Sequence, residues 1–189
     1  IYDSAIRSVK EKITYSQLLE RVNKFAHAMS NAGITKGDRV IIYMPMIPEA
    51  IVSMLACSRI GAIHSVVFGG FASNELAVRI DDAKPKAIIA GSCGIEPTSI
   101  IPYKPLLDKA IEQANHKPNF CVIFQRDELQ APLVSNRDYD WYEFQKSSSE
   151  CTCIPVFGND PLYIFYTSGT TGQPKGVVRP TAGHLVSLM

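Results

Sequence analysis

The sequence has no run of lysine or arginine: 19 basic residues are interspersed with 18 acidic ones, for a net charge of +1. A basic cluster is the feature by which proteins bind nucleic acids and anionic membranes. Apolar stretches are short, and the one from Ala62 to Phe68 is far below the roughly 20 residues that span a bilayer. The first residues do not resemble a signal peptide. We therefore expect no nucleic-acid partner and no membrane insertion.

Cysteine is sparse, with five residues scattered through the chain. An odd, dispersed set argues against a disulfide framework and favours a reducing compartment, which we expect to be the cytoplasm, with the mitochondrial matrix as the alternative. Cys151 and Cys153 form a lone CxC motif without the further ligands that a metal site needs. The four histidines are also dispersed, so we expect no metal held by protein ligands.

Three common active-site motifs are absent. The sequence contains no GxxxxGK[ST], no GxGxxG and no GxSxG, which argues against a P-loop NTPase, a Rossmann dehydrogenase and an α/β-hydrolase. What is present is 189 residues with 46% hydrophobic content, enough to bury the core of one ordinary domain.

Helix-like and strand-like segments alternate along the chain. Thr14 and Gln17 have the spacing of a capping box, and Gly33 is placed to end the helix that follows. Pro48 fits the first position of a second helix that ends at Gly61, and Ser73 is expected to cap a third. The other expected segments are strands at 40–44, 63–68, 87–90, 120–124 and 162–166 and helices at 103–113 and near 139–144. This order predicts an α/β fold with a mainly parallel, helix-covered sheet.

The most informative stretch is YTSGTTGQPKG, from Tyr166 to Gly176, directly after the expected buried strand. Its glycines let backbone amides face an anion, and its serine and threonines add hydroxyl donors. Lys175 supplies one positive charge. A flexible linker is the ordinary interpretation of such composition, but its position after a strand and the closing Pro-Lys-Gly favour a phosphate-binding loop.

This stretch resembles the phosphate-loop signature of the adenylate-forming, or acyl-activating, enzyme superfamily. The resemblance implies binding of ATP with Mg²⁺, attack of a carboxylate on the α-phosphorus to give an acyl-adenylate, and transfer of the acyl group to a thiol, commonly that of coenzyme A. The residues implied to bind the ATP phosphates are Thr167, Ser168, Gly169, Thr170, Thr171, Gly172, Lys175 and Gly176. We expect Lys175 to be catalytic by neutralising pyrophosphate charge, whereas Thr167 is the hydroxyl residue that could instead face the sheet.

A second stretch, from Tyr43 to Ser73, is similar to short-chain acyl-CoA synthetases of the acetate and propionate type. Two segments, GIEP at Gly94 to Pro97 and RPTAGH at Arg179 to His184, favour the propionate type. The resemblance places the nucleotide end of coenzyme A near Glu96, Pro97, Thr98 and Ser99, although an arginine common there in the family is missing. The FGGF segment at 68–71 is expected to be a structural turn.

The other motifs of that superfamily are not found. Nothing resembles the YGxTE, ribose-binding TGD or lid PKTxSGK segments. We therefore expect residues 1–189 to be part of the large N-terminal, AMP-binding domain, without the C-terminal lid, and not to catalyse alone. A noncatalytic nucleotide-binding homologue and an adenylating enzyme with another acceptor remain the alternatives, and the sequence leaves the acyl chain and the oligomeric state open.

Overall fold

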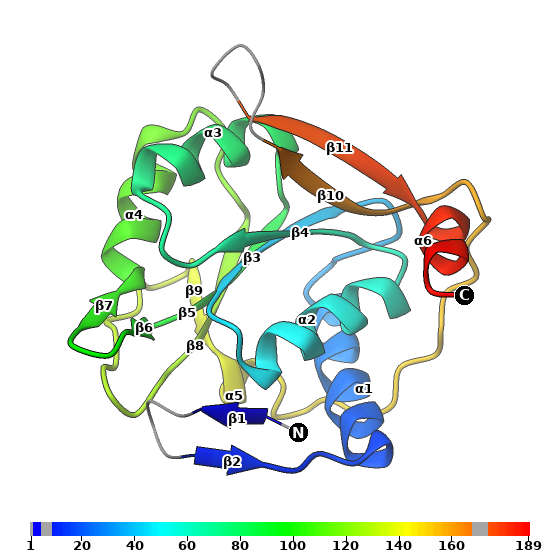
Figure 1. Cartoon of the computed structure of the whole chain (residues 1–189), viewed down its shortest axis with the longest axis horizontal. Coiled ribbons are helices and arrows are strands. Elements are labelled where there is room, and N and C mark those ends of the chain that lie inside the picture. Colours follow the sequence, from blue (N-terminus) through cyan, green and yellow to red (C-terminus); the bar gives the residue numbers. More distant parts are fainter. Residues whose placement is uncertain (1, 5–8, 168–173) are drawn as a thin grey trace.

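A seven-stranded sheet forms the centre of the computed structural model, which describes residues 2–4, 9–167 and 174–189 (Figure 1). The strand order is β11-β10-β4-β3-β5-β8-β9. In chain order these strands are β3 (Arg39–Met44), β4 (Ile63–Phe68), β5 (Ala87–Gly91), β8 (Phe120–Phe124), β9 (Asp138–Asp140), β10 (Pro161–Thr167) and β11 (Lys175–Pro180). Every neighbouring pair is parallel except β10 with β11. The predicted α/β fold with a mainly parallel sheet is confirmed.

Helices cover both faces of this sheet, with α1 and α2 on one face and α3 and α4 on the other (Figure 1). The helices are α1 (Tyr15–Asn31), α2 (Pro48–Arg59), α3 (Ser73–Ala83), α4 (Tyr103–Gln113), α5 (Trp141–Phe144) and α6 (Thr181–Ser187). Two small antiparallel sheets pair β1 (Tyr2–Ser4) with β2 (Val9–Glu11) and β6 (Cys93–Ile95) with β7 (Ile100–Pro102). None of the helices in the described ranges combines the length and apolar character needed to cross a bilayer.

The ends of the first two helices follow directly from the sequence. Thr14 accepts the backbone N–H of Gln17 at 3.2 Å, and the Gln17 side chain accepts the Thr14 N–H at 2.8 Å, so the predicted capping box is confirmed. Gly33 and Gly61, with φ of 90° and 69°, follow α1 and α2. The bonds Ile34 N–H to Met29 and Ala62 N–H to Cys57 complete a Schellman motif at each end. Glycine is needed at both positions because the left-handed conformation strains other residues.

Two expectations from the sequence need correction. Ser73 is the first residue of α3 rather than its cap: Ala72 occupies the N-cap position, and no side chain caps this helix. Strand β10 is only half-buried, and its Phe165 is 57% exposed. The physical reason is its place near the edge of the sheet, where α3 and α6 cover it incompletely.

Trp141 anchors the irregular segment after β8 to the body of the protein. It is buried, and its ring stacks on Phe25 of α1 at 4.0 Å between centroids. The ring also meets Phe124 of β8 edge-on at 5.9 Å. These contacts pack Trp141 into the core, which gives it an anchoring role.

Candidate phosphate-binding site

Strands β10 and β11 form an antiparallel hairpin whose connection contains the predicted phosphate loop (Figure 1). The register pairs Thr167 with Lys175 and Tyr166 with Gly176, so Lys175 lies opposite the residue that enters the loop. β11 is not among the strands expected from the sequence. The adjacent β-branched residues Val177 and Val178 were the available signal for it.

The predicted phosphate-binding residues divide into two groups. Thr167, Lys175 and Gly176 are described, and all three are exposed at the loop end of the hairpin. The other members, Ser168, Gly169, Thr170, Thr171 and Gly172, lie outside the described residues. The hairpin register brings the two ends of the loop together, whereas the phosphate contacts of the individual residues stay predictions.

The stem of the hairpin is packed closely against α3. The Tyr166 hydroxyl donates to Asp82 Oδ2 at 2.6 Å, which joins residues 84 positions apart in the sequence. A Cβ built on Gly176 would lie 3.1 Å from that same Asp82 oxygen and 3.2 Å from Tyr166 Cε1. Since both approaches are tighter than ordinary van der Waals contact, the backbone of β11 fits against Tyr166 and Asp82 because residue 176 has no side chain.

Arg79 of α3 supports the same tyrosine. Its guanidinium carbon lies 5.4 Å from the ring centroid of Tyr166 and 4.7 Å from that of Phe71. Arg79 is buried, and it donates to Glu75 Oε2 at 3.0 Å and to the Glu75 backbone oxygen at 2.6 Å. Burial and the hydrogen bond to Asp82 raise the pKa of Tyr166, so this phenol keeps its proton and acts as a donor at neutral pH.

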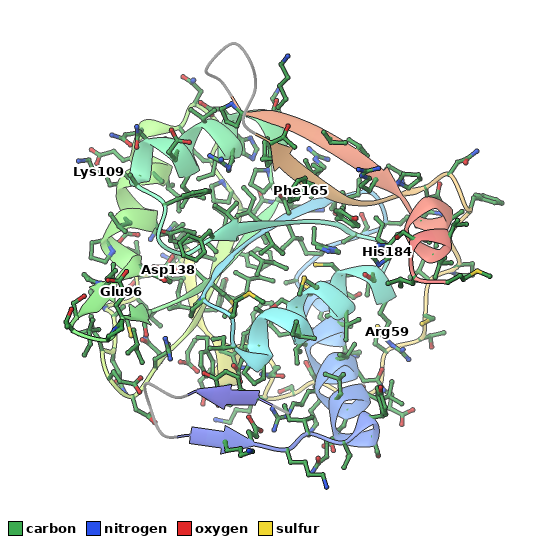
Figure 2. The ribbon with its side chains drawn as sticks, in the orientation of Figure 1. Arg59, Glu96, Lys109, Asp138, Phe165 and His184 are labelled. Atoms are coloured by element: carbon green, nitrogen blue, oxygen red, sulfur yellow. The ribbon has the colours of Figure 1, made fainter. Side chains whose placement is uncertain are left out.

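The predicted coenzyme A segment forms the turn of the β6–β7 hairpin. Glu96, Pro97, Thr98 and Ser99 are all exposed, and the Glu96 N–H donates to Ser99 O at 2.9 Å. Figure 1 shows this hairpin beside α4, away from β11, and Figure 2 labels Glu96 at its tip. The structure therefore does not bring these four residues together with Lys175.

Tyr103, the first residue of α4, contacts both the FGGF turn and the β6–β7 hairpin. Cβ atoms built on Gly69 and Gly94 would lie only 2.2 Å and 2.1 Å from Tyr103 side-chain atoms. Glycine at these two positions therefore lets the turn after β4 and the β6 strand pack on the same tyrosine. Phe68, at the start of the turn, is 64% exposed. The expected structural role of this turn has a physical basis in that packing.

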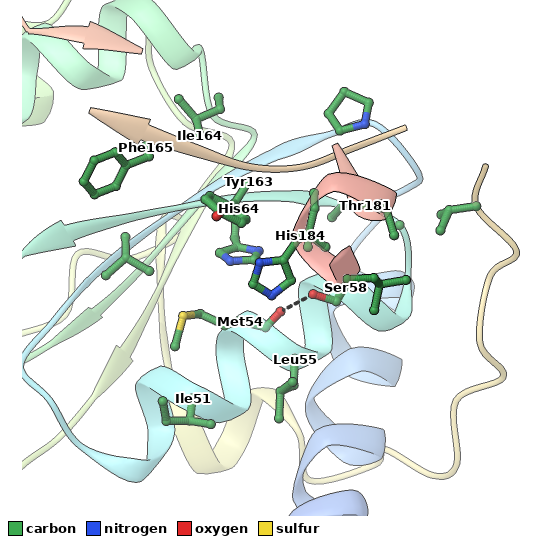
Figure 3. A pocket seen from close by; sticks show the side chains of 17 residues that line it. Ile51, Met54, Leu55, Ser58, His64, Tyr163, Ile164, Phe165, Thr181 and His184 are labelled. Carbon is green, nitrogen blue, oxygen red and sulfur yellow. Dashed lines mark hydrogen bonds between the residues drawn. The ribbon is translucent and has the colours of Figure 1, made fainter. Parts of the chain in front are cut away.

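An apolar cavity of about 580 Å³ lies on the face of β10 opposite Asp82. Residues of α2, β4, β10 and α6 line it, among them Leu55, His64, Tyr163 and His184 (Figure 3). His64 stacks obliquely on Tyr163 at 5.7 Å, and its Nδ1 is buried without a hydrogen-bond partner. Burial, and then the neighbouring His184, lower the pKa of His64 to about 4, so the imidazole is neutral at pH 7.

A metal held by side chains finds no support in the described part of the chain. No group of three or more histidine, cysteine, aspartate or glutamate residues is placed there to bind one ion. Cys151 is partly buried and Cys153 is exposed, and both are free thiols.

Comparison with known proteins identifies the family. Residues 3–189 match the family described as AMP-binding enzyme. The chain is 52% identical, over 189 residues, to the mitochondrial acyl-CoA synthetase short-chain family member 3 of Rattus norvegicus, covering 100% of this chain and 28% of that protein. It is 48% identical, over 178 residues, to the propionate–CoA ligase of Escherichia coli (strain K12), covering 93% of this chain and 28% of that protein.

The chain spans a little over a quarter of the length of these relatives, and its match to the rat protein covers all of the chain, both hairpins included. The family match covers almost every residue of the chain, including the stretch from Tyr166 to Gly176. The chain belongs to the AMP-binding enzyme family.

Proposed function

We propose that this chain forms part of an AMP-forming, short-chain acyl-CoA ligase. In the first step a carboxylate oxygen attacks the α-phosphorus of ATP, giving an acyl-adenylate and releasing pyrophosphate. In the second step the thiol of coenzyme A attacks the acyl carbon and releases AMP. Propionate and acetate are the proposed substrates, since one relative at 48% identity is named a propionate–CoA ligase and others are named short-chain acyl-CoA synthetases.

The observation that carries this proposal is the hairpin that presents YTSGTTGQPKG. Its register sets Lys175 opposite Thr167 at the mouth of a loop rich in glycine and hydroxyl residues. Backbone amides, hydroxyls and one ammonium suit the oxygens of a triphosphate. The 52% identity to a short-chain acyl-CoA synthetase runs through the same residues.

Lys175 is proposed to stabilise the charge that develops on pyrophosphate as its bond to the α-phosphorus breaks. An exposed ammonium at the loop mouth can contact the leaving group without first losing a buried partner. Thr167, Ser168, Gly169, Thr170, Thr171, Gly172 and Gly176 are proposed to position the phosphates. Mg²⁺ would arrive with ATP and be held mainly by phosphate oxygens and water.

Glu96, Pro97, Thr98 and Ser99 are proposed to contact the nucleotide end of coenzyme A. Their exposure at the tip of the β6–β7 hairpin leaves the hydroxyls and backbone groups accessible. Since this turn carries no arginine, recognition of a phosphate there would depend on neutral donors, which bind it more weakly.

The domain organisation and the cellular location are proposed from the family match and from the relatives. Residues 1–189 are proposed to belong to a large N-terminal AMP-binding domain, with a separate lid completing the site. The protein is proposed to act in the cytoplasm or, as the name of the rat relative says of that protein, in mitochondria.

Carboxylate-dependent exchange of labelled pyrophosphate into ATP by the full-length protein tests the proposal. We expect exchange with propionate and acetate, slower exchange with butyrate, and acyl-CoA formation only when coenzyme A is added. A protein that binds ATP but shows no exchange with any of these acids would instead be the noncatalytic homologue. Exchange without acyl-CoA formation would indicate a different acceptor.

A further inference from the structure

Asp82 of α3 approaches both strands of the phosphate hairpin. It accepts the Tyr166 hydroxyl at 2.6 Å, and the same oxygen would lie 3.1 Å from a Cβ on Gly176. Tyr166 and Gly176 are paired across the hairpin. The Asp82 carboxylate therefore holds the Tyr166 side chain of β10 and limits how closely the β11 backbone can approach at Gly176.

This contact lies one register step from the two residues that bound the loop. Tyr166 precedes Thr167, Gly176 follows Lys175, and Thr167 pairs with Lys175. A shift of the Tyr166–Gly176 pair would therefore move the backbone from which the Lys175 side chain extends. Arg79 of the same helix lies over the ring of Tyr166, 5.4 Å from its centroid, while its own charge is paired with Glu75.

The hairpin is also held to the sheet farther from the loop, where the Ser65 hydroxyl donates to Ile164 O at 3.1 Å. β10 pairs with β4 through Tyr163 and His64, three residues before Tyr166, and β11 lies at the edge of the sheet. α6 packs near the opposite end, where Thr181 donates to Asp160 O. The orientation of the loop end thus depends in part on α3, through the hydrogen bond from Tyr166 to Asp82.

We propose that Asp82 is a positioning residue for Lys175 and that it acts through Tyr166 to direct this lysine toward ATP. The inference rests on the proposed function, because it assigns Asp82 a role in ATP binding by the adenylation site. Asp82 does not contact the nucleotide itself. Its loss loosens the hairpin end and weakens the electrostatic contact with the phosphates.

The test measures the ATP dependence of propionate-dependent pyrophosphate exchange by the full-length protein. Variants Asp82→Ala and Tyr166→Phe should each raise the KM for ATP by about three- to tenfold, the effect of losing one charge-assisted hydrogen bond at a partly exposed site. The double variant should be no worse than either single one, because all three lack the same bond. Asp82→Asn should recover most of the wild-type KM, since its amide oxygen still accepts the phenol O–H.

Asp81 supplies a matched control on the same helix. Its carboxylate accepts the His116 N–H at 2.8 Å and the Asn115 amide at 3.0 Å. Both partners belong to the segment after α4 and not to the hairpin. Asp81→Ala should lower the Tm and leave the KM for ATP unchanged. If Asp82→Ala also changed only the Tm, or if the two hairpin variants were additive, Asp82 would be merely structural and the inference would be wrong. If the wild-type protein showed no exchange, the proposed function would fall, and this inference with it.

Discussion

At the scale of single residues, Lys104 is a deeply buried charge. Its side chain is 1% exposed, and its ammonium lies 2.7 Å from Asp108 and 2.8 Å from Asp138. Burial tends to raise the pKa of Asp138, but hydrogen bonds from Arg137 and Lys104 outweigh it and hold the pKa below its ordinary value. The cluster ties α4 to the β8–β9 edge of the sheet.

Removing the Lys104 ammonium should therefore lower the free energy of unfolding. Lys104→Met would leave the fully buried Asp138 carboxylate without one of its charge partners, and we expect the free energy of unfolding to fall by about 3 kcal/mol. Lys146→Met removes a lysine that is 71% exposed and paired with Glu143, and should change it by less than about 0.5 kcal/mol. Denaturant unfolding of both variants checks this, and equal losses would contradict the account.

The lowered pKa of His64 predicts that the stability of the protein depends on pH. The folded protein holds this imidazole neutral down to a pKa of about 4, whereas the ordinary value is 6.5. The unfolded chain binds the proton first as the pH falls, so stability contributed by the neutral ring is present above pH 6.5 and is lost between pH 6.5 and 4. The loss should approach about 3 kcal/mol.

A His64→Leu variant should lack this component, since it cannot titrate and the buried Nδ1 has no partner to lose. Denaturant unfolding at several pH values between 7 and 4 compares the two proteins. Parallel curves for wild type and variant would show that His64 does not cause the loss.

At the scale of elements, Thr14 and Ser73 are both residue types that favour the N-cap of a helix, but only Thr14 caps one. Thr14 caps α1 through a reciprocal pair of hydrogen bonds with Gln17, whereas Ser73 is the first residue of α3 and makes no capping bond. We expect Thr14→Ala to lower the free energy of unfolding by about 1 kcal/mol. Ser73→Ala should change it by less than about 0.5 kcal/mol. Thermal unfolding distinguishes the two, and a larger loss at Ser73 would contradict the assignment.

Elements set by neighbours in the sequence are the ones that sequence analysis predicts well. The capping box at Thr14, the glycine after each of α1 and α2, and α4 from Tyr103 to Gln113 follow from local patterns and are confirmed. β9 and β11 were not predicted, because each is short or exposed and is defined by its partner strand. The hydrogen bond from Tyr166 to Asp82 has no local signal at all, because only the tertiary fold brings these residues together.

The residues of the candidate site were likewise predictable only where a local sequence motif marks them. The motif predicts a phosphate loop with Lys175, and their contacts with phosphate stay predictions, whereas the hairpin register pairs Lys175 with Thr167. The supporting residues Asp82 and Arg79 stand in an ordinary amphipathic helix, and nothing in their spacing distinguishes them from surface charges.

At the scale of the whole molecule, the two predicted ligand segments lie on different hairpins of one fold. β10–β11 carries the proposed ATP-phosphate loop, and β6–β7 carries the proposed coenzyme A segment. The central sheet and α3 hold the first, and Tyr103 of α4 supports the second. In the proposed ligase, the two nucleotide-bearing substrates would therefore approach the same domain at separate places.

Lys175 offers the most direct test of that account. The measurement is the rate of propionate-dependent pyrophosphate exchange by full-length Lys175→Ala, compared with wild type and with Lys109→Ala, which removes a lysine of α4 on a different part of the molecule (Figure 2). We predict that Lys175→Ala loses about a hundredfold or more in exchange rate while Lys109→Ala keeps the wild-type rate. Exchange by Lys175→Ala at the wild-type rate would contradict the assignment of this hairpin to ATP.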